Sequence, residues 1–93
     1  DILEMHLLQR KILWSASNYI NPNGVIIYST CSIEYEENYM VIDAFLKSHP
    51  KFSIEPANDY VPKEFIDDRG AINILPHHHN IDGGFAIRLR NNA

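Results

Sequence analysis

The chain has 93 residues, 45% of them hydrophobic, with four glycines and five prolines. This composition is ordinary for a globular protein and excludes the disordered and fibrous classes, while the length allows one small domain or part of a larger one. Eight Lys and Arg against twelve Asp and Glu give a formal net charge of −4, so the chain lacks the basic surplus with which nucleic-acid-binding domains usually hold phosphate.

The first predicted element is a helix over residues 1–20, where apolar side chains recur at steps of three and four residues. This pattern is already running at Leu3, and the first residue is Asp1, which we interpret as a cut through a longer protein. The segment 21–24 should end the helix, because proline cannot continue the hydrogen-bond ladder and Gly24 can adopt positive φ. The apolar stripe consists of Met5, Leu8, Ile12, Ala16 and Tyr19.

Strands and a second helix are predicted to follow. The β-branched run over 25–29 is typical of a strand buried on both faces of a parallel sheet. A second helix is expected over roughly 34–48, with Tyr35, Tyr39, Ile42 and Leu46 on one stripe. Further strands are predicted at 52–55, 72–75 and 84–90, the last with Phe85, Ile87 and Leu89 on one face, and residues 56–71 are expected to be rich in loops.

This order of elements predicts an α/β fold: a helix, a parallel strand, a helix, then antiparallel edge strands. A single parallel strand with so few neighbours cannot be covered on both faces. We therefore expect the sheet to continue in sequence outside this chain.

The first candidate for chemistry is Cys31, which follows the predicted buried strand and precedes the second helix. Ligands of open α/β sheets bind at the carboxyl ends of strands, and a helix N-terminus favours the thiolate that a nucleophile needs. Ser32 could cap this helix, whereas the neighbouring Glu34, Glu36 and Glu37 oppose a thiolate. A free cysteine can also be a small buried hydrophobe, and position alone leaves both interpretations open.

Three motifs, in order, resemble one family, the Sun-type (Fmu-type) RNA 5-methylcytosine methyltransferases. Tyr28-Ser29-Thr30-Cys31-Ser32-Ile33, followed by Glu36-Glu37-Asn38 and Val41, is similar to the family's YSTCS motif and E-E-N helix. Leu75-Pro76-His77, then Asp82-Gly83 and Phe85, resembles its closing P-H-x-x-x-D-G-F-F segment. Gln9, Leu13 and Ala16 resemble the preceding helix of the family, and Pro22 with Gly24 its P-G-G turn. The resemblance covers essentially all of residues 1–90.

The resemblance implies that residues 1–93 are the C-terminal part of a methyltransferase catalytic domain, the C-terminal portion of a Rossmann-like class I sheet. It implies that Cys31 is the catalytic nucleophile and that the substrate loops contain Thr30, Ser32, Pro76, His77, Asp82 and Gly83. One departure is visible, because Gly84 stands where the family usually has the first of two phenylalanines. This change removes an aromatic side chain close to the substrate.

The implied reaction is the addition of the Cys31 sulfur to carbon 6 of a cytosine and methyl transfer from S-adenosylmethionine to carbon 5. The target base must leave its stack, at a cost on the order of a few kcal/mol. The family's glycine-rich cofactor loop, ribose-binding acid and second cysteine are not found in this chain. We therefore expect the cofactor to be bound by sequence outside it, the chain alone to be inactive, and the substrate of the full-length enzyme to be RNA, in particular rRNA.

Two other functions are compatible with the sequence. A truncated or accessory fragment could keep the fold as a non-catalytic interaction module. A metal or redox site could use Cys31 with His77, His78 and His79, but consecutive side chains on an extended segment point to alternate sides, and no metal is expected. Arg88 and Arg90 could touch phosphate or line a solvated strand face, and Trp14 and Tyr19 are expected to pack rather than to stack on bases.

The single cysteine excludes an internal disulfide and fits a reducing cytosol. No apolar run approaches the roughly 20 residues of a membrane helix. We therefore expect a cytoplasmic protein without a membrane partner.

Overall fold

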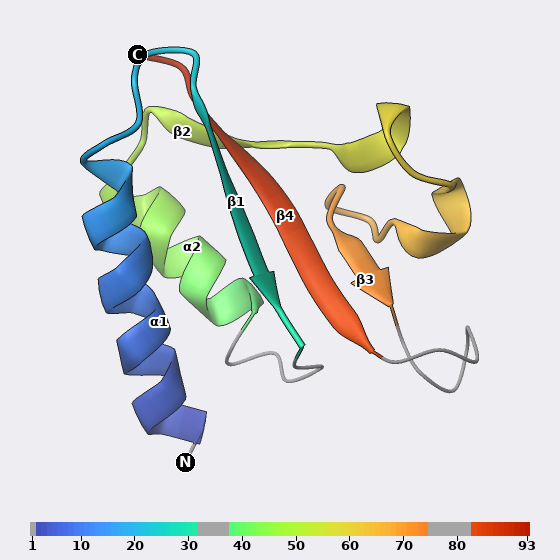
Figure 1. The fold of residues 1–93 in the computed structure, drawn as a ribbon, viewed down its shortest axis with the longest axis horizontal. Helices are drawn as coiled ribbons and strands as arrows, with labels where there is room; N and C mark the ends of the chain where they lie inside the picture. Colours follow the sequence, from blue (N-terminus) through green and yellow to red (C-terminus); the bar gives the residue numbers. More distant parts are fainter. Residues whose placement is uncertain (1, 32–37, 75–82) are drawn as a thin grey trace.

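The computed structural model describes residues 2–31, 38–74 and 83–93. Two α-helices and four strands make up most of this part of the chain, with two short 3-10 helices between β2 and β3 (Figure 1). The elements are α1 (Ile2–Ser17), β1 (Val25–Thr30), α2 (Tyr39–Ser48), β2 (Phe52–Glu55), the 3-10 helices Ala57–Asp59 and Lys63–Phe65, β3 (Ile72–Ile74) and β4 (Gly84–Asn91). Among these described elements, no helix is long and apolar enough to cross a bilayer.

The four strands form one sheet in which β4 pairs antiparallel with each of the other three. β1 pairs along one edge of β4, from Val25 opposite Arg90 to Thr30 opposite Phe85. β2 and β3 share the other edge of β4. Because β1 and β2 are both antiparallel to β4, they run in the same direction, and α2 connects them.

The strands predicted at 52–55 and 84–90 are confirmed, as is the antiparallel pairing of β3 with β4. The strand predicted at 72–75 is observed over Ile72–Ile74, and residue 75 lies outside the described residues. The last strand was expected to be one of the antiparallel strands at an edge of the sheet. In the described sheet it is β4, and it lies between β1 and β2. Alternation within a strand indicates which face is buried, but the choice of neighbours depends on segments far away in the sequence. The expected parallel neighbour of β1 would lie along its other edge, where no described strand pairs, and it stays a prediction.

The core lies between the sheet and the two helices, which cover the same face (Figure 1). The predicted alternation of β4 is confirmed, since Phe85, Ile87 and Leu89 are buried. The remaining buried apolar side chains of this layer come from β1, from the two helices and from the turn before β3: Ile26, Tyr28, Leu13, Val41, Ile42, Phe45 and Ala71. Within this chain β1 is buried on one face only, because both helices lie on the same side, and Ile27 on the opposite face is 64% exposed.

The packing face of α1 differs from the predicted stripe. Leu8 and Ile12 are exposed, Tyr19 is 85% exposed, and the helix instead buries Leu13 and Ser17. The indole of Trp14 packs edge-on against the ring of Phe45, with centroids 5.3 Å apart. Packing was therefore the right expectation for Trp14 and the wrong one for Tyr19, because a helix apolar on two sides does not indicate by sequence alone which side meets the sheet.

The turn after α1 is built differently from its prediction. The positive φ, 68°, belongs to Asn23, and Gly24 is needed for a different reason. A Cβ on Gly24 would lie 2.8 Å from the carbonyl oxygen of Asn21, which is closer than real Cβ contacts. Asparagine tolerates the left-handed region, so the glycine is left to provide the close approach.

The second face of the sheet carries an ion-pair group. Arg88 and Arg90 pair with Glu55 at 2.8 and 2.6 Å, and the Arg88 guanidinium lies over the ring of Tyr60. The pKa of Glu55 lies below its ordinary value, chiefly because Arg90 donates a hydrogen bond to the carboxylate. The positive charges of both arginines and the hydrogen bond from Arg88 lower this pKa further, and together these effects outweigh the loss of solvent around Glu55, which raises it. Both arginines therefore have carboxylate partners within the sheet.

Two glycines of this fold are expected to respond oppositely to substitution. Gly70 has φ +93°, and a Cβ there would lie 2.9 Å from Pro56, so Gly70→Ala should lower the free energy of unfolding by about 1–3 kcal/mol. A Cβ on Gly84 would meet only the carbonyl oxygen of Thr30, at an ordinary 3.7 Å. Gly84→Ala should therefore raise the free energy of unfolding by about 0.5–1 kcal/mol. Urea unfolding of the two variants measures both values, and a stabilised Gly70→Ala protein would contradict this account.

Candidate functional site

Three of the predicted site residues meet at one end of the sheet. Thr30 is the last residue of β1, Cys31 follows it, and Gly83 directly precedes β4. Because Thr30 lies opposite Phe85, the end of β1 and the start of β4 are adjacent. The side chain of Cys31 is exposed.

Four other predicted residues, Ser32, Pro76, His77 and Asp82, lie outside the described residues. The described residues on either side of 75–82 nevertheless lie close to the cysteine end of the sheet, because Ile74 pairs with Gly84. The first described turn of α2 begins at Tyr39, so a helix N-terminus at Cys31 also stays a prediction.

A short hydrogen bond lies next to Cys31. The Thr30 hydroxyl donates to the side-chain oxygen Oδ1 of Asn38 at 2.6 Å. Asn38 is 4% exposed, and it stands at the N-cap position of α2 without a side-chain capping bond to that helix. The side chain of Asn38 therefore links the start of α2 to the end of β1.

The next residue, Tyr39, is held by a carboxylate from the loop before β3. Its hydroxyl donates to Oδ2 of Asp67 at 2.7 Å, and Oδ1 of Asp67 accepts the backbone N–H groups of Arg69 and Ala71 at 2.9 and 3.1 Å. Partial burial, the hydrogen bond to Asp67 and the charge of Asp67 raise the pKa of Tyr39, so the hydroxyl keeps its proton as a donor.

No role in the site was predicted for Asn38, Tyr39 or Asp67. Asn38 stood in the resemblance as the last letter of the E-E-N motif, and Asp67 lies in the stretch 56–71, which was expected to be rich in loops. Neither the motif nor the loop composition predicts the contacts that these residues make. The Thr30–Asn38 contact joins residues 8 positions apart in the sequence, and the Tyr39–Asp67 contact joins residues 28 positions apart.

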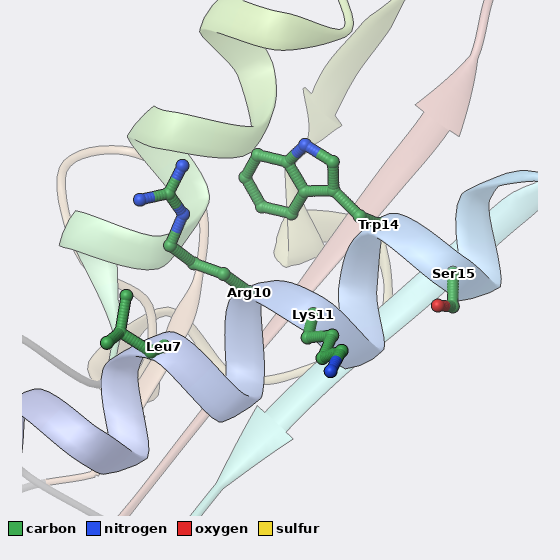
Figure 2. A pocket seen from close by; sticks show the side chains of 5 residues that line it. All are labelled: Leu7, Arg10, Lys11, Trp14 and Ser15. Atoms are coloured by element: carbon green, nitrogen blue, oxygen red, sulfur yellow. The ribbon is translucent and has the colours of Figure 1, made fainter.

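Two hollows on the described surface lie away from Cys31. One, of about 360 Å³, runs along α1, where Figure 2 shows the Arg10 side chain beside the indole of Trp14, with Leu7, Lys11 and Ser15 also lining the surface. The other, of about 170 Å³, lies on the second face of the sheet between Ile27, Tyr60 and Ile72. Neither is lined by Cys31, Thr30 or Gly83, and among the described residues Cys31 is exposed.

Two glycines and the potential metal ligands of the described residues bear on cofactor and metal binding. Gly24 and Gly70 pack closely against Asn21 and Pro56, so neither opens a cradle for a ligand. No group of three potential metal ligands converges in residues 2–31, 38–74 and 83–93, and His77 to His79 lie outside those ranges.

Comparison with known proteins places the chain in a family. The family model described as 16S rRNA methyltransferase RsmB/F matches residues 1–90. A relative from Serratia proteamaculans named ribosomal RNA small subunit methyltransferase F is 33% identical over 88% of this chain and 18% of its own length. A Bacillus subtilis relative, a probable ribosomal RNA small subunit methyltransferase B, is 34% identical over 97% of this chain and 21% of its own. The chain thus spans about a fifth of the length of these curated relatives.

Solved structures agree in fold. A methyltransferase homologue from Pyrococcus horikoshii superimposes with a TM-score of 0.82 at 27% identity, covering 98% of this chain and 32% of the other. NSun6 from the same organism, solved with SFG, gives a TM-score of 0.77 at 26% identity, covering 95% of this chain and 22% of the other. The expected architecture, α/β with antiparallel strands in the manner of a Rossmann-like methyltransferase, is therefore confirmed. The chain belongs to the 16S rRNA methyltransferase RsmB/F family.

Proposed function

We propose that this chain carries the nucleophile of an RNA cytosine-5 methyltransferase, with Cys31 as the residue that adds to the base. The observation that carries the proposal is the exposure of Cys31 at the carboxyl end of β1. A thiol buried in the core could not reach a nucleotide, whereas this one stands at the sheet end where α/β proteins bind ligands. The family match, whose name specifies 16S rRNA, suggests the class of substrate.

The chemistry assigned to Cys31 is covalent catalysis. The thiolate forms a bond from Sγ to carbon 6 of cytosine, and the electrons of the 5,6 double bond make carbon 5 nucleophilic. S-adenosylmethionine, when bound, supplies the methyl group that carbon 5 receives. Loss of the carbon-5 proton to a base then re-forms the double bond, which breaks the bond to sulfur and releases Cys31 as a thiolate.

Binding of S-adenosylmethionine is assigned to residues outside this chain, since its sequence contains no glycine-rich cofactor loop. Residues 1–93 would then be the C-terminal part of a larger catalytic domain, inactive alone. The exposed apolar side chains of Leu8, Ile12 and Ile27 support this, because an intact domain would cover such residues. The full-length enzyme would act on rRNA in the cytoplasm.

The function is tested on 16S rRNA from cells with and without the full-length gene. Digested to nucleosides and analysed by mass spectrometry, rRNA from the deletion strain should lack one 5-methylcytidine that the wild-type gene restores. The purified full-length enzyme should transfer the methyl group of S-adenosylmethionine to carbon 5 of a cytosine in unmodified 16S rRNA. A full-length enzyme that restores no methylcytidine would instead favour a non-catalytic interaction module.

A further inference from the structure

We infer that Asn38 is a positioning residue for Cys31, acting through the hydroxyl of Thr30. The inference rests on the proposed role of Cys31 as the nucleophile. Asn38 lies seven positions after Cys31 in the sequence. Its side chain restrains Thr30, the last residue of β1, directly before the cysteine.

One hydrogen bond connects Asn38 to the residue before Cys31. The Thr30 hydroxyl donates to Oδ1 of Asn38 at 2.6 Å, and Asn38 is almost completely buried. A hydrogen bond in such surroundings is electrostatically stronger than one in water, and a buried partner left without it is costly. The bond therefore restrains Thr30, and Cys31 is the next residue.

Asn38 occupies the N-cap position of α2. Its backbone oxygen accepts the N–H of Ile42 at 3.1 Å, which makes Asn38 the first acceptor of the helix. An asparagine at this position usually turns its side-chain oxygen back onto the first helical N–H groups. Asn38 makes no such capping bond, and its Oδ1 accepts from the strand instead. The side chain thus serves the contact with β1 in preference to its own helix.

Contacts of Tyr39 anchor the start of α2 independently of the hydrogen bond between Thr30 and Asn38. The ring of Tyr39 packs edge-on against Phe85 at 5.1 Å between centroids, and Phe85 lies opposite Thr30 across the sheet. The Tyr39 hydroxyl bonds to Asp67, which the loop before β3 holds by two backbone N–H groups. The hydrogen bond between Asn38 and Thr30 therefore joins two held points, the start of α2 and the last residue of β1, and it adds a side-chain restraint to Thr30 beside the backbone pairing with β4.

These contacts form a closed circuit through Thr30, Asn38, Tyr39 and Phe85 at the base of Cys31. A nucleophile must meet carbon 6 at a defined distance and direction, and a misplacement of about 1 Å can cost about 100-fold in rate. A small thiol reagent approaches from any direction and needs no such placement. Loss of the circuit should therefore slow attack on the base and leave simple alkylation of the thiol unchanged.

The test uses the full-length enzyme and a 16S rRNA transcript containing 5-fluorocytosine, with S-adenosylmethionine present. Thr30→Val keeps the shape of the side chain and removes the donor, and it should slow covalent adduct formation at saturating RNA by about 10- to 100-fold. Thr30→Ser, which keeps the hydroxyl, should recover most of the lost rate. Alkylation of Cys31 by iodoacetamide, measured on its peptide by mass spectrometry, should proceed at the wild-type rate in both variants.

Asn38→Ala supplies the partner arm. Combined with Thr30→Val it should slow adduct formation no further than the slower single variant, because both changes remove the same bond. Ser53→Ala, at the far end of the sheet, is the control and should form adduct at the wild-type rate. If Asn38→Ala fails to fold, the comparison of Thr30→Val with Thr30→Ser still decides the matter.

The outcomes separate this inference from the proposed function. Wild-type enzyme that forms no adduct would overturn both. A Cys31-dependent adduct that forms as fast in Thr30→Val as in wild type would overturn the inference and leave the function standing. Faster alkylation with a lowered Tm in Thr30→Val would mean that the hydroxyl only stabilises the fold, which also overturns a positioning role.

Discussion

Cys31→Ala in the full-length enzyme is expected to lower methyl transfer to 16S rRNA by about a thousand-fold or more and to abolish the covalent adduct with 5-fluorocytosine RNA. The reason is that carbon 5 of cytosine becomes nucleophilic only after a nucleophile has added to carbon 6. Fluorine at carbon 5 cannot leave as a proton does, so the enzyme remains bonded to the RNA. Denaturing gel electrophoresis of labelled RNA detects this bond as a slower-migrating species.

The same substitution should leave RNA binding intact, because the exposed thiol contributes little to the packing of the sheet. Ser53→Ala is the matched control: it is another exposed side chain of similar size, at the opposite end of the sheet from the candidate site. It should form the adduct at the wild-type rate. An adduct that survives Cys31→Ala would assign the addition to a different residue and remove Cys31 from its proposed role.

The elements of this fold could be predicted where the signal is local. The alternation of Phe85, Ile87 and Leu89 correctly predicted both the strand and its buried face. The β-branched run before Cys31 correctly predicted the strand that ends at the site. The stretch 56–71 was expected to be rich in loops from its residue types, and two short 3-10 helices are the regular structure found in residues 56–71. Each of these depends on residues within a few positions of one another.

What the sequence could not provide were contacts between distant segments. The place of β4 between β1 and β2 depends on pairing choices made across the whole chain. The helix α1 offers apolar residues on two sides, and only the sheet decides that Leu13 is buried while Leu8 is not. The contacts of Asn38 with Thr30 and of Tyr39 with Asp67 are likewise products of the assembled fold. Cys31 itself was assigned by resemblance, because its position alone suited a buried thiol equally well.

Phe45→Ala is expected to lower the free energy of unfolding by about 3–5 kcal/mol, the largest effect on stability among these substitutions. Phe45 is 0% exposed, at the contact between the two helices and the sheet. Its ring packs edge-on against Trp14 and Phe52 at 5.3 and 5.1 Å and stacks on His49 at 4.2 Å. Removing it leaves a cavity bordered by three rings, one from α1, one from β2 and one from the residue that follows α2, which cannot all close on the vacant space.

Met40→Ala on the same helix is the matched control, because Met40 is 43% exposed and alanine is a good helix former, so it should change the free energy of unfolding by less than about 0.5 kcal/mol. Urea unfolding followed by tryptophan fluorescence measures both values. Trp14 is the single tryptophan of this chain and lies against Phe45, so its emission reports on the layer that the substitution disturbs. Equal decreases in the free energy of unfolding of the two variants would mean that the contact between α2 and the sheet does not depend on Phe45. That result would also contradict the account of α2 as an anchored element from which Asn38 reaches Thr30.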